Sequence, residues 1–215
     1  MMRHKTISRF ASLIFLVPAL AMAGLKPGSV VIYTDGDVEK LVEQNEEWSL
    51  WEDQRKRRYK RSYLPYFPVL EYRRFKESPS GYDQFVSDMR AVELKPFSSR
   101  ESVQFTLIRR DLNKGARSSH WRCSYAGQSS YRLSKQDLVT EDYSCTRFLV
   151  DKRHIQKVRE KLVVSYSPSL NLVVKQIKTN RQGKETRVAV KRILTPERAT
   201  AKRIARTVYK LHTSR

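Results

Sequence analysis

The chain has 215 residues, with 43 Lys and Arg against 22 Asp and Glu, and a formal net charge of +21 at pH 7. Hydrophobic residues make up 40% of the chain, and eleven residues are Tyr. This apolar content is enough to build a core, which excludes wholesale disorder, and the length suits one domain with or without an appendage.

The first 23 residues have the three parts of a secretory signal peptide. Basic residues precede an apolar run over residues 10–20, and small residues place the cleavage site between Ala23 and Gly24. The alternative is a membrane anchor, but Pro18 interrupts the run, which is shorter than the roughly 20 apolar residues that a span needs. We therefore expect an exported protein, periplasmic or secreted, with no transmembrane span after cleavage.

The positive charge is concentrated at the end of the chain. Residues 151–215 contain 18 Lys and Arg against four acidic residues, a net of +14, whereas residues 24–150 carry only +4. This asymmetry predicts an anionic partner, either an anionic envelope surface, an acidic envelope protein, or nucleic acid met outside the cell. The alternative is a generally basic protein whose charge serves solubility.

Residues 24–100 mix the signals of strands and helices. The β-branched run 30–33 ends at the turn pair Asp35-Gly36, which is typical of a strand. Apolar residues at near-helical spacing with intervening Glu predict a helix over about 37–48. The aromatic and proline-rich segment 63–68 favours extended backbone.

The most basic run of the chain lies between these segments and surrounds Tyr59. Basic side chains bind the backbone of a polyanion, and neighbouring aromatic rings stack on bases or sugars. The alternative is a solvated face that the acidic residues over 46–53 neutralise locally. The candidate anion-binding residues in this run are Arg55, Lys56, Arg57, Arg58, Lys60 and Arg61.

From about residue 101 the pattern becomes that of β-strands. Apolar residues alternate with polar ones over 103–107, and the same period recurs near residues 121–125, 143–150, 161–166, 170–178 and 187–194. Sequential strands joined by short turns favour antiparallel pairing. We therefore predict a mainly β (α+β) fold, an antiparallel curved sheet or sandwich, in which a signal peptide (1–23) and an N-terminal part (24–100) precede the β region (101–215).

Two cysteines, Cys123 and Cys145, lie in the part of the chain that is expected to be exported. A disulfide is the default in an oxidising compartment, and a closed loop of about 22 residues would stabilise the fold by about 3 kcal/mol. A metal pair or a reactive thiol is the alternative, although the sequence has no C-x-x-C motif. Pairing within one chain or across a dimer is left open.

The chain ends in a predicted basic helix. Thr195 is the expected N-cap and Pro196 the first helical residue. The candidate anion-binding residues on this helix are Lys202, Arg203, Arg206 and Lys210. An amphipathic basic helix either lies on an anionic surface or docks its apolar face on its own domain.

Three short motifs together resemble a pattern in exported bacterial envelope proteins of unknown function. They are Trp121-Arg122-Cys123, the segment Cys145-Thr146-Arg147, and Tyr166-Ser167-Pro168-Ser169-Leu170. The resemblance covers residues 100–194 and implies an antiparallel sheet that curves around a helix, in the envelope. It implies no reaction.

No catalytic motif stands out in the sequence. There is no H-E-x-x-H, no G-x-S-x-G and no glycine-rich phosphate loop. We therefore expect a non-catalytic envelope protein with no cofactor and no metal, which binds its partner through a basic surface. A secreted nucleic-acid-binding protein is the alternative, followed by an envelope-polymer hydrolase.

Overall fold

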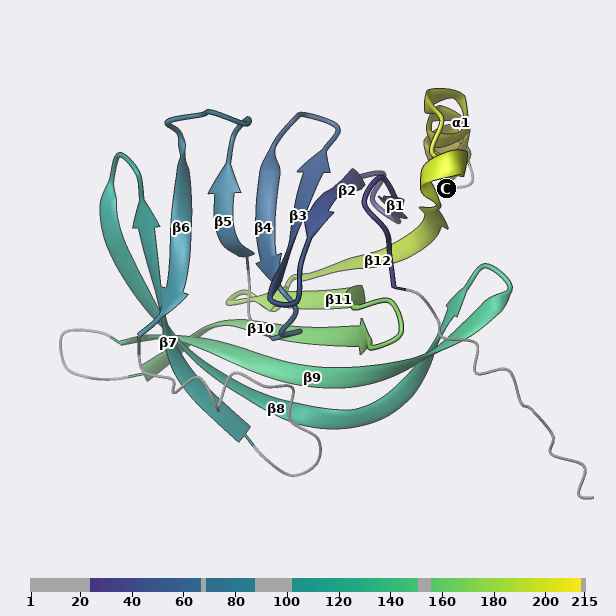
Figure 1. Cartoon of the computed structure of the whole chain (residues 1–215). Coiled ribbons are helices and arrows are strands. Elements are labelled where there is room, and N and C mark those ends of the chain that lie inside the picture. The colour runs from purple at the N-terminus through teal and green to yellow at the C-terminus, as the bar shows by residue number, and fades with distance from the viewer. Residues whose placement is uncertain (1–23, 67–68, 88–101, 151–155, 214–215) are drawn as a thin grey trace, which may run out of the picture.

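A computed structural model describes residues 24–66, 69–87, 102–150 and 156–213 (Figure 1). The predicted signal peptide, residues 1–23, lies outside these residues. The first six strands are β1 (Val30–Tyr33), β2 (Val38–Gln44), β3 (Trp48–Asp53), β4 (Arg58–Ser62), β5 (Val69–Arg73) and β6 (Gly81–Val86). The remaining strands are β7 (Ser102–Asp111), β8 (Gly115–Leu133), β9 (Gln136–Val150), β10 (Gln156–Ser167), β11 (Leu172–Asn180) and β12 (Glu185–Leu194).

These strands form a closed antiparallel barrel in which each strand pairs with its neighbours in the sequence. The barrel closes where β1 pairs with β12, with Val30 opposite Leu194 and Val31 opposite Ile193. The prediction of a mainly β fold is confirmed, but the curved open sheet or sandwich is wrong. Alternation and turns indicate which strands are neighbours, but they do not indicate that the two edge strands meet, because that contact joins residues about 160 positions apart in the sequence.

The predicted helix over 37–48 is also wrong, because this segment forms β2 and the start of β3. Leu41 is fully buried, and Glu39 is nearly so on the same, inward side of the strand. A strand usually alternates apolar and polar residues, so a carboxylate on the buried face hides the period of two. Cross-strand pairing with β1 and β3 decides the conformation here against the local pattern.

The β8–β9 hairpin is the longest in the barrel and curves under the other strands (Figure 1). Near its tip, the Tyr131 hydroxyl donates a hydrogen bond of 2.7 Å to the Val190 carbonyl of β12, which holds the tip against the barrel. The strands predicted within residues 101–194 are all present, and each one is longer than its pattern indicated or shifted by a few residues.

Two groups of apolar side chains line the inside of the barrel, and a third lies outside it. One inner group includes Val31, Leu41 and Trp51. The other inner group includes Trp121, Tyr143 and Val164. The outer group consists of Val30, Ile32, Val38 and Leu194, and it packs against the C-terminal helix. Because neighbouring residues of β1 point to opposite faces, one short strand contributes to both the inner and the outer group.

The C-terminal segment forms a 3-10 turn (Pro196–Arg198) and then α1 (Ala201–Thr213). The helix is present as predicted, but it starts later than Thr195, whose side chain forms no capping hydrogen bond. Gly36, in the β1–β2 turn, has a φ of +95°, and a Cβ built there would lie 3.1 Å from Nε2 of His212. The end of α1 therefore rests directly on this turn.

Candidate functional site

The ten predicted anion-binding residues lie in two separate places. Those of residues 55–61 belong to the β3–β4 turn and to β4, whereas the other four lie on α1. The two groups belong to different elements, so each is considered separately.

Acidic neighbours pair with much of the 55–61 run. Both Lys56 and Arg58 contact Glu52, with N···O distances of 3.0 and 3.2 Å, and Arg57 contacts Asp53 at 2.5 Å. The two cations lower the pKa of the Glu52 carboxyl, although burial by itself raises it. Only Arg55 and Lys56 of the run are well exposed. Little of the positive charge of residues 55–61 is therefore both exposed and unpaired, as binding to an anionic partner would require.

The remaining two residues of the run have other environments. The Lys60 ammonium lies 4.1 Å from the centre of the Trp48 ring, a cation–π contact. Arg61 faces the barrel interior, where its guanidinium donates two hydrogen bonds to the Glu39 carboxylate, at 2.6 and 2.7 Å. Glu39 also accepts a hydrogen bond of 2.8 Å from the Tyr33 hydroxyl. Burial disfavours the charged guanidinium, but Glu39 raises the pKa of Arg61, so Arg61 stays charged inside the barrel.

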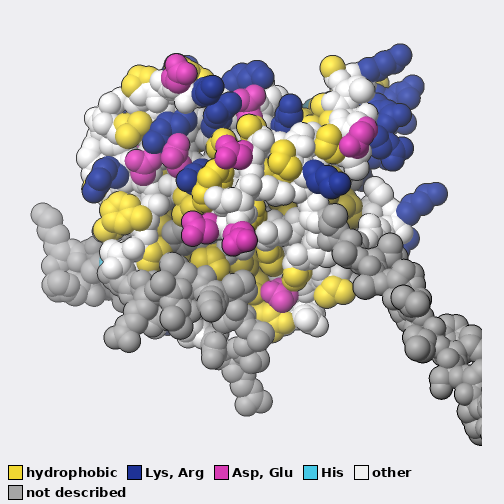
Figure 2. Space-filling model, in the orientation of Figure 1, with side chains coloured by type: hydrophobic (Ala, Val, Ile, Leu, Met, Phe, Trp, Pro, Cys, Tyr) yellow, Lys and Arg dark blue, Asp and Glu magenta, His cyan; other side chains and the backbone are white. Residues whose placement is uncertain are grey.

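The basic residues of α1 have the opposite arrangement. Ile204, Val208 and Leu211 pack against the outer apolar group of the barrel, so docking of the helix on its own sheet, one of the two predicted alternatives, is what the structure has. The side chains of Lys202, Arg203, Arg206 and Lys210 are exposed. No acidic residue lies within α1, and Figure 2 shows Lys and Arg gathered over this helix. We call these four residues the basic face of α1.

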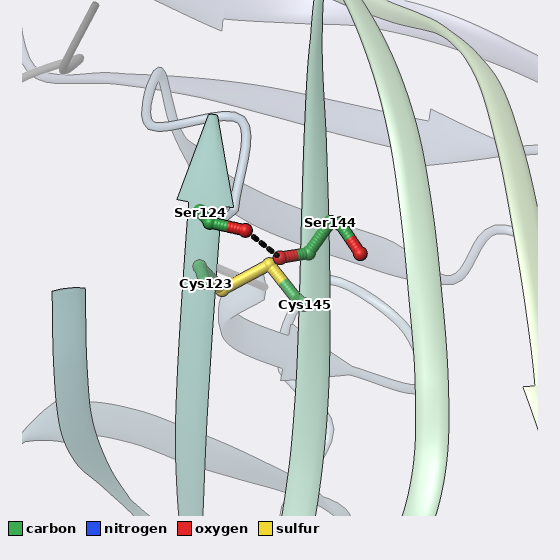
Figure 3. The surroundings of a disulfide bond; sticks show 4 residues. All are labelled: Cys123, Ser124, Ser144 and Cys145. Atoms are coloured by element: carbon green, nitrogen blue, oxygen red, sulfur yellow. Dashed lines mark hydrogen bonds between the residues drawn. A yellow bond between two sulfur atoms is a disulfide. The ribbon is translucent and has the colours of Figure 1, made fainter. Parts of the chain in front are cut away.

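The disulfide between Cys123 and Cys145 is present and lies within one chain. The two cysteines are directly opposite each other on β8 and β9, with their Cα atoms 4.0 Å apart, and both are fully buried (Figure 3). On the outer side of the same strands, the Ser124 hydroxyl donates a long hydrogen bond of 3.5 Å to the Ser144 carbonyl. The disulfide joins the two longest strands where they pass under the barrel core.

Sequence reasoning missed a cavity of about 880 Å³ inside the barrel, which we call the lumen. Its apolar floor consists of Tyr66, Leu107, Trp121, Val164 and Tyr166, all of them buried. The signal that could have found it is the presence of single charged residues, such as Arg109, Arg147, Glu160 and Lys178, on the otherwise apolar face of a strand pattern. Charged residues at such positions indicate a lumen only if the sheet is known to close into a barrel.

Charged side chains gather at one end of the lumen. The Glu160 carboxylate contacts Arg147 at 3.3 Å and Lys178 at 2.9 Å. The Asp111 carboxylate contacts Arg109 at 2.7 Å and Arg117 at 3.4 Å. We call Arg109, Arg117, Arg147 and Lys178 the mouth cations. In these two clusters, cations outnumber carboxylates two to one.

The buried tyrosines predict a fold that loses stability in alkali. Burial raises the pKa of Tyr66 and of Tyr166 from 10.0 to about 12, and it raises the pKa of Tyr143 further. A pKa raised by folding stabilises the fold below pH 10, and this contribution is lost as the pH rises from 10 to 12. Each unit corresponds to about 1.4 kcal/mol per tyrosine. We expect the urea midpoint to fall steeply over this interval.

The matched variant for this prediction is Tyr66→Phe, which removes one ionisable group and keeps the ring. Its urea midpoint should fall less than that of the wild type between pH 10 and 12. A wild-type midpoint that stays constant across this interval would contradict the prediction.

Among the described residues, no three His, Cys, Asp or Glu side chains come together in a group that could hold a metal ion. Within the same ranges, the structure contains no helix with the length and apolar character needed to cross a membrane.

No family model and no curated protein matches this sequence. In structure, the chain is similar to the hypothetical lipoprotein YmcC of Escherichia coli K12, with a TM-score of 0.48 and 9% identity over 76% of this chain and 82% of that chain. It is also similar to a candidate lipoprotein of Parabacteroides distasonis, with a TM-score of 0.42 and 7% identity. The match covers 80% of this chain and 98% of that chain. Because both TM-scores are below 0.5, the proposals below rest on this chain's own residues.

Proposed function

We propose that this chain is an exported, non-catalytic protein of the cell envelope that binds a phosphate-bearing lipid surface through the basic face of α1. Export rests on the signal-peptide pattern of residues 1–23. The short cysteine and proline motifs that resemble exported envelope proteins agree with this compartment.

The arrangement of α1 is the observation that carries the proposal. The helix uses its apolar residues to dock on β1, β2 and β12, so its four cations are held on a fixed scaffold and point to solvent. A cation near an anionic membrane surface contributes about 1 kcal/mol, and the attraction decays within a Debye length. The apolar face is already occupied, so the expected contact is electrostatic and does not involve insertion into the bilayer.

The test is cosedimentation of the mature protein with phosphatidylcholine vesicles, with and without phosphatidylglycerol. We expect binding only to the vesicles that contain phosphatidylglycerol, and release at high salt. The variant Arg203→Glu, Arg206→Glu and Lys210→Glu should lower the bound-to-free ratio by at least about two orders of magnitude. Three cations of about 1 kcal/mol each are lost, every 1.4 kcal/mol is tenfold, and the three added carboxylates are repelled by the surface.

A matched control makes the same change in net charge elsewhere. Lys114, Arg181 and Lys184 are exposed in hairpin turns away from α1, so their replacement by Glu should leave binding nearly unchanged. Equal loss in both triple variants would overturn the proposal, because it would assign the effect to net charge alone. Absence of vesicle binding together with salt-sensitive retention of DNA would favour the nucleic-acid alternative instead.

A further inference from the structure

The lumen has the size of a ligand site. Small-molecule pockets occupy about 300–1,000 Å³, and the lumen measures about 880 Å³. In a barrel of about eight strands the side chains fill the interior or leave room for one small ligand. This barrel has twelve strands, so its diameter is larger and its side chains leave more of the interior open.

The lumen is amphipathic along its axis. On β10, the inward residues run from Glu160 at one end through Leu162 and Val164 to Tyr166. On β11, the order from the same end is Lys178, Gln176, Val174 and Leu172, because the strand runs in the opposite direction.

Two more strands repeat this order. The inward residues change from Arg109 to Leu107 along β7, and from Arg117 through Ser119 to Trp121 along β8. On β9, Leu149 lines the lumen nearest this end, Arg147 follows opposite Trp121 and Glu160, and Cys145 lies opposite Leu162. Four of these five neighbouring strands therefore begin with a charged side chain at this end and continue with apolar ones, and β9 adds Arg147 one inward position further along.

At the charged end of the lumen, the positive charge of the mouth cations exceeds the negative charge of the carboxylates that pair with them, so an anion could bind there. Among the described residues, the four mouth cations form ion pairs with two carboxylates, those of Asp111 and Glu160. Nε of Arg147 is buried and has no hydrogen-bond partner among the described residues, and the guanidinium lies 5.8 Å from the Trp121 ring. The acidic residues Asp35 and Asp37 line the lumen from the β1–β2 turn, so an anion would lie nearer to β9–β11.

We propose that the lumen binds a single-chain anionic amphiphile, an acyl chain that ends in a carboxylate or a phosphate. The chain lies against Trp121, Leu162 and Val164, and the head group accepts hydrogen bonds from Arg147 and Lys178. An unpaired buried donor is costly, and a ligand oxygen at Arg147 removes that cost. This site is separate from the basic face of α1 and does not depend on the proposed surface binding.

The experiment is calorimetric titration of the mature protein with sodium decanoate, dodecanoate and tetradecanoate, each below its micelle concentration. Burial of methylene groups should tighten binding roughly tenfold for each pair of carbons added. Tetradecanol, which has the same chain and no charge, should bind at least tenfold more weakly. The lysophosphatidate of the same chain length, compared with tetradecanoate, identifies the preferred head group.

Variants connect the binding to the lumen. Arg147→Gln and Lys178→Gln should each weaken tetradecanoate binding about tenfold and leave tetradecanol binding unchanged, as expected for one charge-assisted hydrogen bond. The control is Lys175→Gln, on the outward face of the same strand as Lys178, which should bind as the wild type does. Near-ultraviolet circular dichroism checks that each variant is folded.

Failure of tetradecanoate to bind the folded wild type would overturn the proposal. Equal binding of tetradecanol and tetradecanoate, insensitive to both lumen variants, would also overturn it. The triple α1 variant separates the two proposals, because it should bind tetradecanoate as the wild type does even though it no longer sediments with vesicles. Conversely, Arg147→Gln should still sediment with vesicles.

Discussion

Replacing both Cys123 and Cys145 by alanine is expected to lower the free energy of unfolding by about 3 kcal/mol. The disulfide closes a loop with a sequence separation of 22, which contains the tip of the β8–β9 hairpin. Without it, the unfolded chain gains the entropy of that open loop. Because both sulfur atoms are buried, the two alanines also leave unfilled space beside Trp121 and Tyr143.

The measurement is equilibrium urea unfolding followed by tryptophan fluorescence. The variant should unfold at a lower urea concentration than the oxidised wild type. A reducing agent should move the wild-type midpoint toward that of the variant and leave the variant's own midpoint unchanged. Identical midpoints for the variant and the oxidised wild type would contradict the prediction.

The second large effect is expected from Glu39→Gln, which removes the carboxylate that Arg61 and Tyr33 share inside the barrel. Glu39 is only 9% exposed, so the guanidinium would keep its charge in a partly buried position without a counter-ion. Breaking one partner of a buried pair costs about 3–5 kcal/mol. Because Arg61 retains some exposure, at 28% of its side chain, we expect the lower end, about 3 kcal/mol.

A double variant separates the cost of the orphaned charge from the value of the pair. Glu39→Gln combined with Arg61→Met should lose less stability than Glu39→Gln alone, because no unpaired charge remains. The control is Asp137→Asn, which breaks the exposed pair with Arg132, whose side chains are 61% and 62% exposed. That change should cost under about 1 kcal/mol. Equal losses for Glu39→Gln and Asp137→Asn would contradict the interpretation.

The 55–61 run and the basic face of α1 are both rich in Lys and Arg in the sequence, but they differ in how far their charges are paired and exposed in the fold. The 55–61 run follows Glu52 and Asp53 through a tight turn, so its acids and bases come within ion-pair distance. Local sequence pointed to this neutralisation, because both groups lie within a few residues of each other. The pairing of Arg61 with Glu39 could not be predicted, since it requires β2 and β4 to flank β3.

The pattern of residues determined much of this protein without the structure. Alternation over residues 101–194 predicted the strands that carry Trp121, Cys123 and Cys145, and export predicted their disulfide. The amphipathic pattern of the last segment predicted a basic helix with one apolar face, which Ile204, Val208 and Leu211 form in the structure. These features depend on the period of an element or on the chemistry of single residues, and both are readable locally.

Only the tertiary structure decided that the sheet closes, that residues 38–44 form a strand, and that charged residues of five strands meet near one end of a lumen. Each of these depends on contacts between residues far apart in the sequence. Closure requires β1 to reach β12, and Glu39 tolerates its inward position because Arg61 arrives from another strand. A local sequence pattern does not indicate such distant partners, because the contacts between them stabilise the chain only once the barrel has formed.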